Sequence, residues 1–440
     1  MEFYSTNNPN HRVGAKEAIF RGLPADNGLY MPERITPLPD SFFRDLPGLS
    51  FADIGFRVSR QLLGNEISDT DLRRIVEDTL SFPAPVVELD PQKFILELFH
   101  GPSLAFKDFG ARFMSRLMHH YNDDPKPLTI LVATSGDTGG AVAAGFYDTP
   151  GIEVVILYPS GKVSDLQEKQ LTTLNKNIHA LEIDGTFDDC QALVKQAFLD
   201  ADLRGRLRLS SANSINISRL IPQAFYYFEA FKQLGPGEPV VFSVPSGNFG
   251  NITAGLLAKR LGLPIHHFIA ATNLNDVVPQ YLTGGIYKTA VSVATLSNAM
   301  DVGAPSNFAR MANLYGHIGA TDDLTSFTHG GMKEDISGYA FDDQRTEAAV
   351  REVKNLYNYT IDPHGAVGYL ALDQYQASHP GTRGVILETA HPAKFLPDMQ
   401  RILSATIEVP ERLASLRKLT KRATQMDPSY PDFRKWLLER

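Results

Sequence analysis

The chain has 440 residues, of which 43% are hydrophobic and 21% are charged. This length exceeds one ordinary domain, and we expect two or three domains with sizeable cores. Acidic residues outnumber basic ones by 50 to 42, which gives a net charge of -8. That balance excludes a general surface for nucleic acid or for an anionic membrane. We therefore expect any anionic ligand to be bound by a local cluster of donors.

The single cysteine, Cys190, excludes an internal disulfide. It lies in an amphipathic helical stretch, FDDCQALVKQAF, so we expect it to pack in the core rather than to act in catalysis. The N-terminus lacks the basic and then apolar pattern of a signal peptide, and no apolar run approaches 18 residues. These features predict a soluble, cytoplasmic protein that has no membrane partner.

The first 95 residues contain turn-rich and helical segments. Residues 22–39 are loop-like, and residues 50–81 have helical apolar spacing with acidic caps. A strand-like run, KFILELF, follows at 93–99. At the other end of the chain, the basic segment 412–440 is expected to be a solvated helix, with Trp436 packed on the body of the protein.

From residue 128 onward, apolar strands alternate with helical segments in two series. Such alternation predicts an α/β fold with mostly parallel sheets that helices cover on both faces. Two series indicate two α/β domains with a cleft between them. We expect an N-terminal region at 1–95, a smaller α/β domain at 96–235 and a larger one at 236–440. The expected strands lie at 128–133, 152–158, 177–183, 239–244, 264–272 and 384–389.

The segment HGPSLAFKDFG, residues 100–110, contains a lysine between two aromatic residues: Lys107, flanked by Phe106 and Phe109. An ammonium near apolar surface loses hydration, so its pKa falls and its neutral amine becomes a nucleophile and base. Such a lysine can form a Schiff base with an aldehyde cofactor. The alternative is a lysine whose stem covers apolar surface while its ammonium reaches water.

Two glycine-rich loops each follow an apolar strand and open a helix. They are ATSGDTGG at 133–140 and PSGNFGN at 245–251. In that geometry, unpaired backbone N–H groups gather at the positive end of a helix dipole and form an anion site. Neither loop matches the P-loop or the dinucleotide-binding pattern, which disfavours nucleotide binding. Alternatively, each loop is only a strand-to-helix connection.

A third polar segment, SSANSINISRL, occupies residues 210–220. Its asparagines, together with Arg219, can bind a phosphate through charge-assisted hydrogen bonds. The alternative is that Asn213 or Ser214 caps the following helix while Arg219 is solvated.

A fourth segment, ETAHPAKF at 388–395, directly follows a predicted strand. Thr389 would lie at the carboxyl end of a parallel strand, where ligands bind in open α/β sheets. A helix cap is the competing interpretation. We expect no metal at His391, because no second ligand stands at metal spacing in this stretch.

In combination, these motifs resemble the signature blocks of the threonine synthase family. The blocks occur in order from about residue 4 to at least residue 400, and the bacterial and fungal branch is the most similar. That family consists of fold type II pyridoxal-phosphate enzymes, which are carbon–oxygen lyases. They convert O-phospho-L-homoserine and water to L-threonine and phosphate, the last step of threonine biosynthesis. The matching blocks are RGLPADNGLYMPE, HGPSLAFKDFG, ATSGDTG, NSINISR, SVPSGNFGN, ATLSNAMDVG and ETAHPAKF.

The resemblance implies a role for each matching residue. Lys107 would bond the cofactor aldehyde and carry protons, and Thr389 would meet the pyridine nitrogen. Asp137 would face the ring oxygen of the cofactor, where related enzymes often have asparagine, and a carboxylate there needs a proton or another partner. The cofactor phosphate would be cradled by Ser246, Gly247, Asn248, Phe249 and Gly250. The substrate carboxylate would meet Ser135, Gly136 and Thr138, and the substrate phosphate Thr134, Asn213 and Arg219.

The implied reaction is a γ-elimination of phosphate followed by addition of water at Cβ, with pyridoxal phosphate as the electron sink. One rival is a dehydratase of the same fold acting on serine or threonine, which Arg219 disfavours because those substrates have no phosphate. Another is a non-catalytic phospho-ligand-binding protein. A nucleotide-binding kinase is disfavoured, because this sequence lacks the P-loop lysine. We expect a small-molecule substrate, no nucleic-acid partner, no metal, and a monomer or homodimer.

Overall fold

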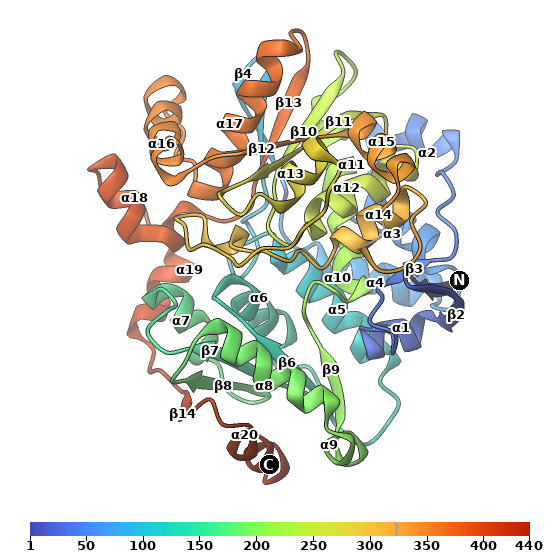
Figure 1. The fold of residues 1–440 in the computed structure, drawn as a ribbon, viewed down its shortest axis with the longest axis vertical. Coiled ribbons are helices and arrows are strands. Elements are labelled where there is room, and N and C mark those ends of the chain that lie inside the picture. Colours follow the sequence, from blue (N-terminus) through green and yellow to red (C-terminus); the bar gives the residue numbers. More distant parts are fainter. Residues whose placement is uncertain (322–323) are drawn as a thin grey trace.

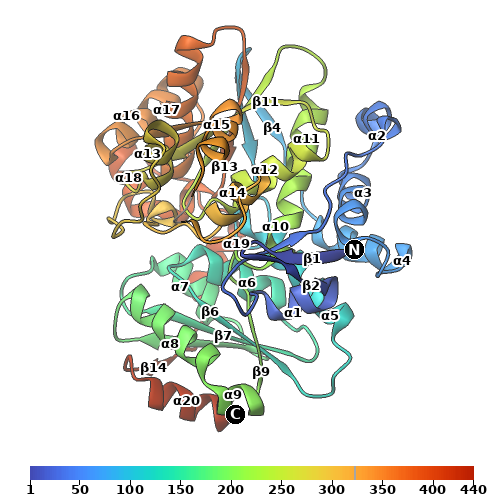
Figure 2. The same ribbon diagram turned by 45° about the vertical axis from the view of Figure 1, so that its right-hand side comes forward.

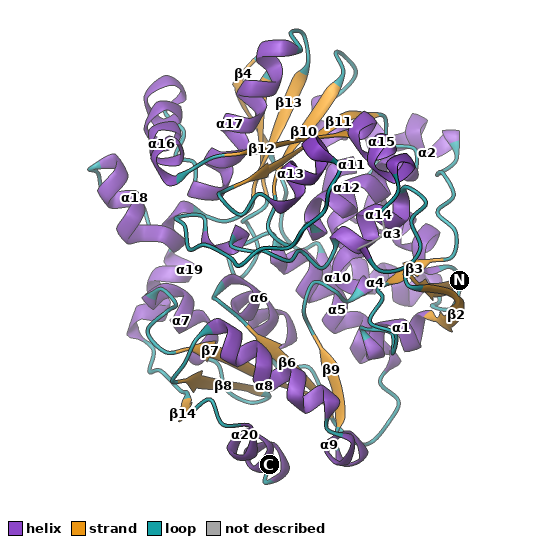
Figure 3. Ribbon diagram, in the orientation of Figure 1, coloured by secondary structure: helices purple, strands orange, loops and turns teal. Residues whose placement is uncertain are grey.

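The computed structural model describes residues 1–321 and 324–440, and contains two large sheets and a small N-terminal one (Figure 1). The six-stranded sheet lies in the upper half of Figure 1 and the five-stranded sheet in the lower half. Figure 3 shows that helices surround both of them. Among the described residues, no helix combines the length and apolarity needed to cross a membrane.

The six-stranded sheet is parallel except at its edge, where β4 runs antiparallel to β5. Apolar side chains on both faces are buried, as a covered parallel sheet requires. Val241 and Ile269 belong to one core with α16 and α17, whereas Phe242 and Phe268 belong to another with α11 and α12. In sheet order, the strands are β12 (Ile336–Ala340), β11 (Ile265–Thr272), β10 (Val240–Pro245), β13 (Arg383–Glu388), β5 (Lys93–Glu97) and β4 (Val86–Asp90). The helices of this half are α11 (Phe225–Leu234), α12 (Gly250–Arg260), α13 (Val277–Gly284), α14 (Phe308–Leu314), α15 (Ser326–Asp335), α16 (Asp343–Tyr357), α17 (Pro363–Ser378) and α18 (Leu396–Leu403).

The five-stranded sheet is parallel throughout. Cys190 and Leu193 of α8 pack on one face of it, and Trp436 of α20 packs against the same core, so both sequence predictions are confirmed. In sheet order, the strands are β14 (Thr424–Met426), β8 (Ile178–Ile183), β7 (Ile152–Pro159), β6 (Leu128–Ala133) and β9 (Arg208–Ser211). Its helices are α5 (Lys107–Tyr121), α6 (Asp137–Phe146), α7 (Asp165–Thr172), α8 (Phe187–Leu199), α9 (Ala201–Arg206) and α20 (Tyr430–Leu438).

The N-terminal region packs beside α5, on the right-hand side of Figure 2. Its longest helix, α3, begins at a capping box in which the Ser50 hydroxyl and the Asp53 carboxylate each bond the other residue's backbone N–H. The elements are β1 (Glu2–Ser5), β2 (Asn8–Gly14), α1 (Ala15–Arg21), β3 (Tyr30–Pro32), α2 (Asp40–Asp45), η1 (Leu46–Gly48), α3 (Phe51–Leu63) and α4 (Asp69–Thr79). Among the described residues, four short helices lie between the two halves along the chain: α10 (Ile217–Leu220), η2 (Ile221–Ala224), α19 (Glu411–Ala414) and η6 (Ser415–Lys418). Two others, η3 (Asn298–Met300) and η5 (Pro392–Phe395), lie within the half of the six-stranded sheet.

The α/β prediction is confirmed, but several strands differ from the sequence expectation. The prediction of one solvated C-terminal helix is wrong, because residues 424–426 form β14 and pair with β8. The small antiparallel sheet of β1, β2 and β3, and the strands β9 and β12, were not predicted. The six-stranded sheet combines β4 and β5, at residues 86–97, with strands after residue 235, and the five-stranded sheet combines β14 with strands before residue 235. The domain ranges therefore do not coincide with the sheets.

Candidate active site

Lys107 is the first residue of α5, and backbone hydrogen bonds fix the segment before it against the end of β13. The Phe106 N–H donates to the Thr389 carbonyl oxygen at 2.9 Å, and the His391 N–H donates to the Leu104 carbonyl oxygen at 3.1 Å. Leu104 has a left-handed backbone, with φ of 59°, which reverses the chain direction before the helix. The segment that leads into Lys107 therefore lies beside Thr389.

The Lys107 amine has ionic neighbours but no hydrogen-bond partner among the described residues. Its Nζ lies 3.9 Å from Asp137 Oδ2, and 16% of its side-chain surface is exposed. Burial lowers the pKa of Lys107 to about 8; Asp137 opposes that shift, and the Lys394 and Arg219 cations reinforce it. Nζ is 5.9 Å from the centre of the Phe106 ring. The other expected flank, Phe109, packs in the core instead.

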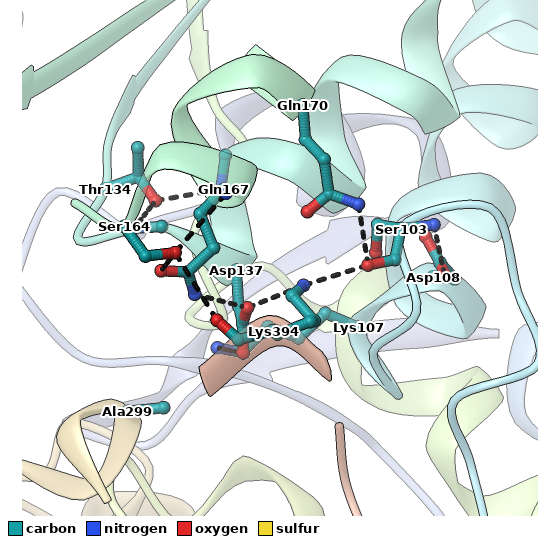
Figure 4. Close-up of polar contacts among 12 residues, drawn as sticks. Ser103, Lys107, Asp108, Thr134, Asp137, Ser164, Gln167, Gln170, Ala299 and Lys394 are labelled. Atoms are coloured by element: carbon teal, nitrogen blue, oxygen red, sulfur yellow. Dashed lines mark hydrogen bonds and ion pairs between the residues drawn. The ribbon is translucent and has the colours of Figure 1, made fainter. Parts of the chain in front are cut away.

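Asp137, the first residue of α6, pairs with a buried lysine from the opposite half of the molecule (Figure 4). Lys394 Nζ lies 2.6 Å from Asp137 Oδ1, and Gln167 Nε2 donates to the same oxygen at 2.8 Å. Burial favours the neutral acid, but the Lys394 and Lys107 cations outweigh it and hold the pKa of Asp137 far below its ordinary value. The structure thus gives Asp137 a partner that the sequence did not indicate.

The loop 246–250 joins β10 to α12 and exposes backbone donors at a helix start. The N–H groups of residues 247–250 have no acceptor among the described residues. Phe249 adopts a left-handed backbone with φ of 59°, a strained conformation for a bulky residue that is typical of binding loops. The Ser246 hydroxyl donates to the Val244 carbonyl at 2.8 Å, so this proton points back into the strand. The Asn248 side chain links Ser214 Oγ to the Ser306 N–H.

The turn at 298–300 covers this loop so closely that residue 247 must be glycine. A Cβ there would lie 2.6 Å from the Ala299 carbonyl oxygen and 2.7 Å from Met300 Cα. The turn is itself fixed: the Ala299 N–H donates to His364 Nε2 at 3.2 Å, and His364 Nδ1 contacts Asp362 at 2.7 Å. The 297–303 block therefore supports the loop from outside.

The loop 134–138 joins β6 to α6 and presents a second group of backbone donors. Thr134 Oγ1 accepts hydrogen bonds from the N–H groups of Gly136, at 3.0 Å, and Gly139, at 2.8 Å, and so shapes the loop from within. Gly136 has a φ of 138°, which favours glycine. The N–H groups of Ser135, Asp137 and Thr138 have no acceptor among the described residues. Ser135 is exposed, and Thr138 is half-buried.

Arg219 lies in α10 and is buried, with 3% of its surface exposed, so the alternative of a solvated arginine is wrong. One Nη donates to the Ala212 carbonyl, whereas its Nε is buried without a partner among the described residues. The guanidinium packs against α5, where a Cβ at Gly110 would lie 2.9 Å from Nε. The helix cap is Asn216 rather than Asn213 or Ser214, and the half-buried Asn213 side chain has no hydrogen-bond partner among the described residues.

Arg310 is a buried cation for which the sequence carried no signal. Its guanidinium is fully buried and donates to the carbonyl oxygens of Tyr30, Ser214 and Ile215 and to Asn307 Oδ1. All of these acceptors are neutral, so no carboxylate among the described residues is in hydrogen-bond contact with its charge. Burial lowers the pKa of Arg310 to about 9, which leaves the side chain charged at neutral pH. It connects the N-terminal region to the loop that carries Asn213.

A cavity of about 330 Å³ opens beside the Asp137–Lys394 pair. Its lining includes Gln167, Asn298 and Lys394, but not Lys107. Within the described part of the chain, no group of three or more His, Cys, Asp or Glu side chains is arranged to hold a metal.

Comparisons with known proteins match the chain over its whole length. Residues 2–80 match the family described as threonine synthase N terminus, residues 82–389 the pyridoxal-phosphate dependent enzymes, and residues 365–435 the threonine synthase C-terminal family. Threonine synthase from Escherichia coli is 46% identical over 100% of this chain and 99% of that protein. The enzyme from Haemophilus influenzae is 45% identical over 100% of both. The chain belongs to the threonine synthase family.

Solved structures agree with that family assignment. The crystal structure of Escherichia coli threonine synthase has a TM-score of 0.90 at 44% identity and covers 100% of both chains. Pyridoxal-phosphate-bound threonine synthase from Brucella melitensis has a TM-score of 0.93 at 34% identity and covers 100% of this chain and 99% of its own. Maize serine racemase, at 16% identity, a TM-score of 0.55, and coverage of 76% of this chain and 97% of its own, shares the fold alone. The chain is therefore a fold type II, pyridoxal-phosphate-dependent lyase.

The residues of the site fit this cofactor. Lys107 offers an amine with no hydrogen-bond partner among the described residues for the aldehyde. Loop 246–250, at the start of the 11-residue helix α12, offers free N–H groups for the phosphate. The Thr389 hydroxyl has no hydrogen-bond partner among the described residues and is available to a ring nitrogen beside Lys107. Pyridoxal phosphate has an aldehyde, a phosphate and a ring nitrogen, one for each of these three parts of the site.

Proposed function

We propose that this chain converts O-phospho-L-homoserine and water into L-threonine and phosphate. The observation that supports this most strongly is the arrangement around Lys107, whose neighbours include Asp137 of loop 134–138 and the buried Arg219. Loop 246–250 follows β10, which pairs with the strand that precedes Thr389. One loop suffices for the cofactor phosphate. The loop 134–138 and Arg219 then remain for a substrate that has anionic groups of its own. Serine and threonine have no phosphate, so a dehydratase would leave Arg219 without a ligand.

The charge balance of the site supports a dianionic substrate. Lys107, Lys394 and Arg219 are cationic side chains with little or no exposed surface, and they lie close enough to interact electrostatically. Against them stand the ionised Asp137 and Asp108, whose pKa is raised by burial to about 6. Buried charges are costly unless they are paired. The excess positive charge therefore favours ligands that bring phosphate and carboxylate groups.

We assign the proposed roles as follows. Arg219, with Asn213 and the loop that Thr134 shapes, holds the substrate phosphate, and the free N–H groups at Ser135 and Thr138, with Gly136 between them, receive the carboxylate. The N–H groups of Gly247, Asn248, Phe249 and Gly250 hold the cofactor phosphate, with Ser246 shaping the turn from the strand side. Thr389 faces the cofactor's ring nitrogen, and Asp137 faces its ring oxygen.

When bound, pyridoxal phosphate supplies an electron sink that acidifies the substrate's Cα and Cβ hydrogens. Lys107 carries one proton at a time: as a neutral amine near pH 7 to 8 it takes the Cα proton, and it must hand that proton on within the site before it takes one from Cβ. Arg219 stabilises the negative charge that develops as phosphate leaves Cγ. Lys107 returns the Cβ proton to Cγ. After water adds its hydroxyl at Cβ, two protons remain, one from Cα and one from water: Lys107 returns one to Cα, and the other leaves on the released phosphate. Cytoplasmic location and a monomeric or homodimeric state stay predictions from the sequence.

The test is an end-point assay with the purified full chain, pyridoxal phosphate and O-phospho-L-homoserine. The proposal expects threonine and phosphate in a one-to-one ratio. Serine and threonine, offered separately, should give little or no keto acid. Keto acid from serine or threonine without threonine from phosphohomoserine would transfer the assignment to a dehydratase, and no product from any of them would leave a binding protein.

A further inference from the structure

The Asp137–Lys394 pair raises a question of charge. Asp137 is ionised in the site, and the proposed function sets it against an electron-rich ring oxygen of the cofactor. Two anionic oxygens facing each other repel unless a cation lies nearby. Lys394 is that cation: its Nζ is 2.6 Å from Asp137 Oδ1, and its side chain has no exposed surface.

Lys394 reaches Asp137 from the other half of the molecule. It lies in η5, just beyond Thr389 and β13, whereas Asp137 begins α6 of the five-stranded half. Its Nζ also donates to the Ser103 carbonyl oxygen at 2.8 Å, which accepts from Gln170 Nε2 at 2.9 Å. Figure 4 shows this group of side chains converging beside Lys107. Lys394 thus contacts both the carboxylate and the segment that leads into the reactive lysine.

We propose that Lys394 is a positioning residue, which fixes Asp137 as an ionised carboxylate beside Lys107. Lys394 serves as the counter-ion of Asp137, so that Lys107 does not become the sole cationic partner of that carboxylate. This inference rests on the proposed function, whose reactive amine it concerns. Lys394 touches no reacting atom; it acts through Asp137. The residue is present in the ETAHPAKF block, but only the fold brings it to Asp137.

The proposal has a definite electrostatic sign. The groups that face Lys107 come from several elements. They are Asp137 from α6, Lys394 from η5, Arg219 from α10 and the Phe106 ring from the segment before Lys107 itself. Removing Lys394 deletes one nearby cation and leaves the buried Asp137 carboxylate with Lys107 as its remaining ion-pair partner. Both changes favour the protonated amine, so the pKa of Lys107 should rise. A merely structural role for Lys394 would lower stability without that shift.

The test measures Lys107 itself rather than turnover. The full chain, with cofactor removed, is pulse-labelled with acetic anhydride across a pH series, and the peptide containing Lys107 is quantified by mass spectrometry. With Lys394→Met, we expect the labelling midpoint to rise by at least one pH unit, which lowers labelling at pH 7 about tenfold. Lys394→Arg, which keeps the cation, should stay near the wild type, as should the exposed control Lys435→Met.

A second pair of variants keeps the test decisive if Lys394→Met fails to fold. With Asp137→Asn, Lys107 loses its carboxylate and should label at a lower midpoint than the wild type. Adding Lys394→Met to that variant should raise the midpoint again, because the neighbouring cation is gone. Equal midpoints for the two, or unchanged labelling in Lys394→Met, would overturn the proposal. The labelling needs neither cofactor nor substrate. The proposal about Lys394 can therefore fail while the chain still forms threonine, and it can hold while the chain forms none.

Discussion

Substituting Gly247 by alanine isolates one contact between the phosphate loop and the turn above it. Gly247 lacks a positive φ, so alanine is allowed by the backbone, and the cost comes from packing. The added Cβ would lie 2.6 Å from the Ala299 oxygen, whereas ordinary Cβ contacts begin at 3.4 Å. The turn must therefore move by roughly 0.8 Å, although the hydrogen bond that the Ala299 N–H donates to His364 holds it in place. Overpacking of this kind costs about 1–3 kcal/mol, which corresponds to a roughly 5- to 150-fold loss of cofactor affinity.

The assay is titration of the cofactor-free chain with pyridoxal phosphate, followed by visible absorbance, with thermal unfolding as a check on the fold. Gly250→Ala is the matched milder variant, because its Cβ would lie 3.3 Å from the Asn307 side-chain nitrogen, a much smaller overlap. Gly205→Ala is the neutral control, since no atom of the described residues lies within 4 Å of the added Cβ. If Gly247→Ala binds the cofactor as tightly as Gly250→Ala, the rigid turn does not shape the phosphate site.

Three further predictions follow from the same site. Because burial lowers the pKa of Lys107 to about 8, the rate at which the cofactor-free chain captures pyridoxal phosphate should rise tenfold per pH unit up to about 8 and then level off; stopped-flow absorbance measures it, and a flat profile contradicts it. Arg219→Met should raise KM for O-phospho-L-homoserine about 10- to 100-fold, the value of a charge-assisted hydrogen bond, with cofactor absorbance retained; an unchanged KM in a steady-state assay removes Arg219 from the phosphate site. Burial raises the pKa of Asp108 from 3.8 to about 6, so between these pH values the folded chain binds more protons at this residue than the unfolded chain does. The contribution of Asp108 to the free energy of unfolding therefore falls as pH rises from about 4 to about 6. Asp108→Asn should flatten that part of the pH profile measured by urea unfolding, and an unaltered slope would refute the prediction.

The sequence predicted the strands and helix starts that carry the candidate site residues, because each lies in a short motif. Lys107, Thr389 and the two glycine loops follow strands whose apolar runs are readable, and parallel strands bring their carboxyl ends to one edge. The chain reversal at Leu104 that joins Lys107 to Thr389 could not be read, since a left-handed leucine has no sequence signature.

What the sequence did not predict depends on contacts between distant segments. Lys394 becomes a partner of Asp137 only after the two sheets are assembled, and Arg310 donates to Tyr30, which lies 280 positions earlier in the sequence. The three-residue strand β14 exists because β8 offers it an edge, so its own composition gives no signal. Secondary-structure propensity reflects residues that are neighbours along the chain, whereas these contacts join residues that are neighbours only in space.

The most direct test of the account is to find the lysine that bonds the cofactor. The holoenzyme is reduced with borohydride, which fixes the cofactor to its lysine, then digested and analysed by mass spectrometry. The account predicts the phosphopyridoxyl group on Lys107, and no visible absorbance or labelled peptide in Lys107→Ala. The group on Lys394, the other buried lysine of the site, or on no lysine at all, would contradict the assignment of the reactive amine.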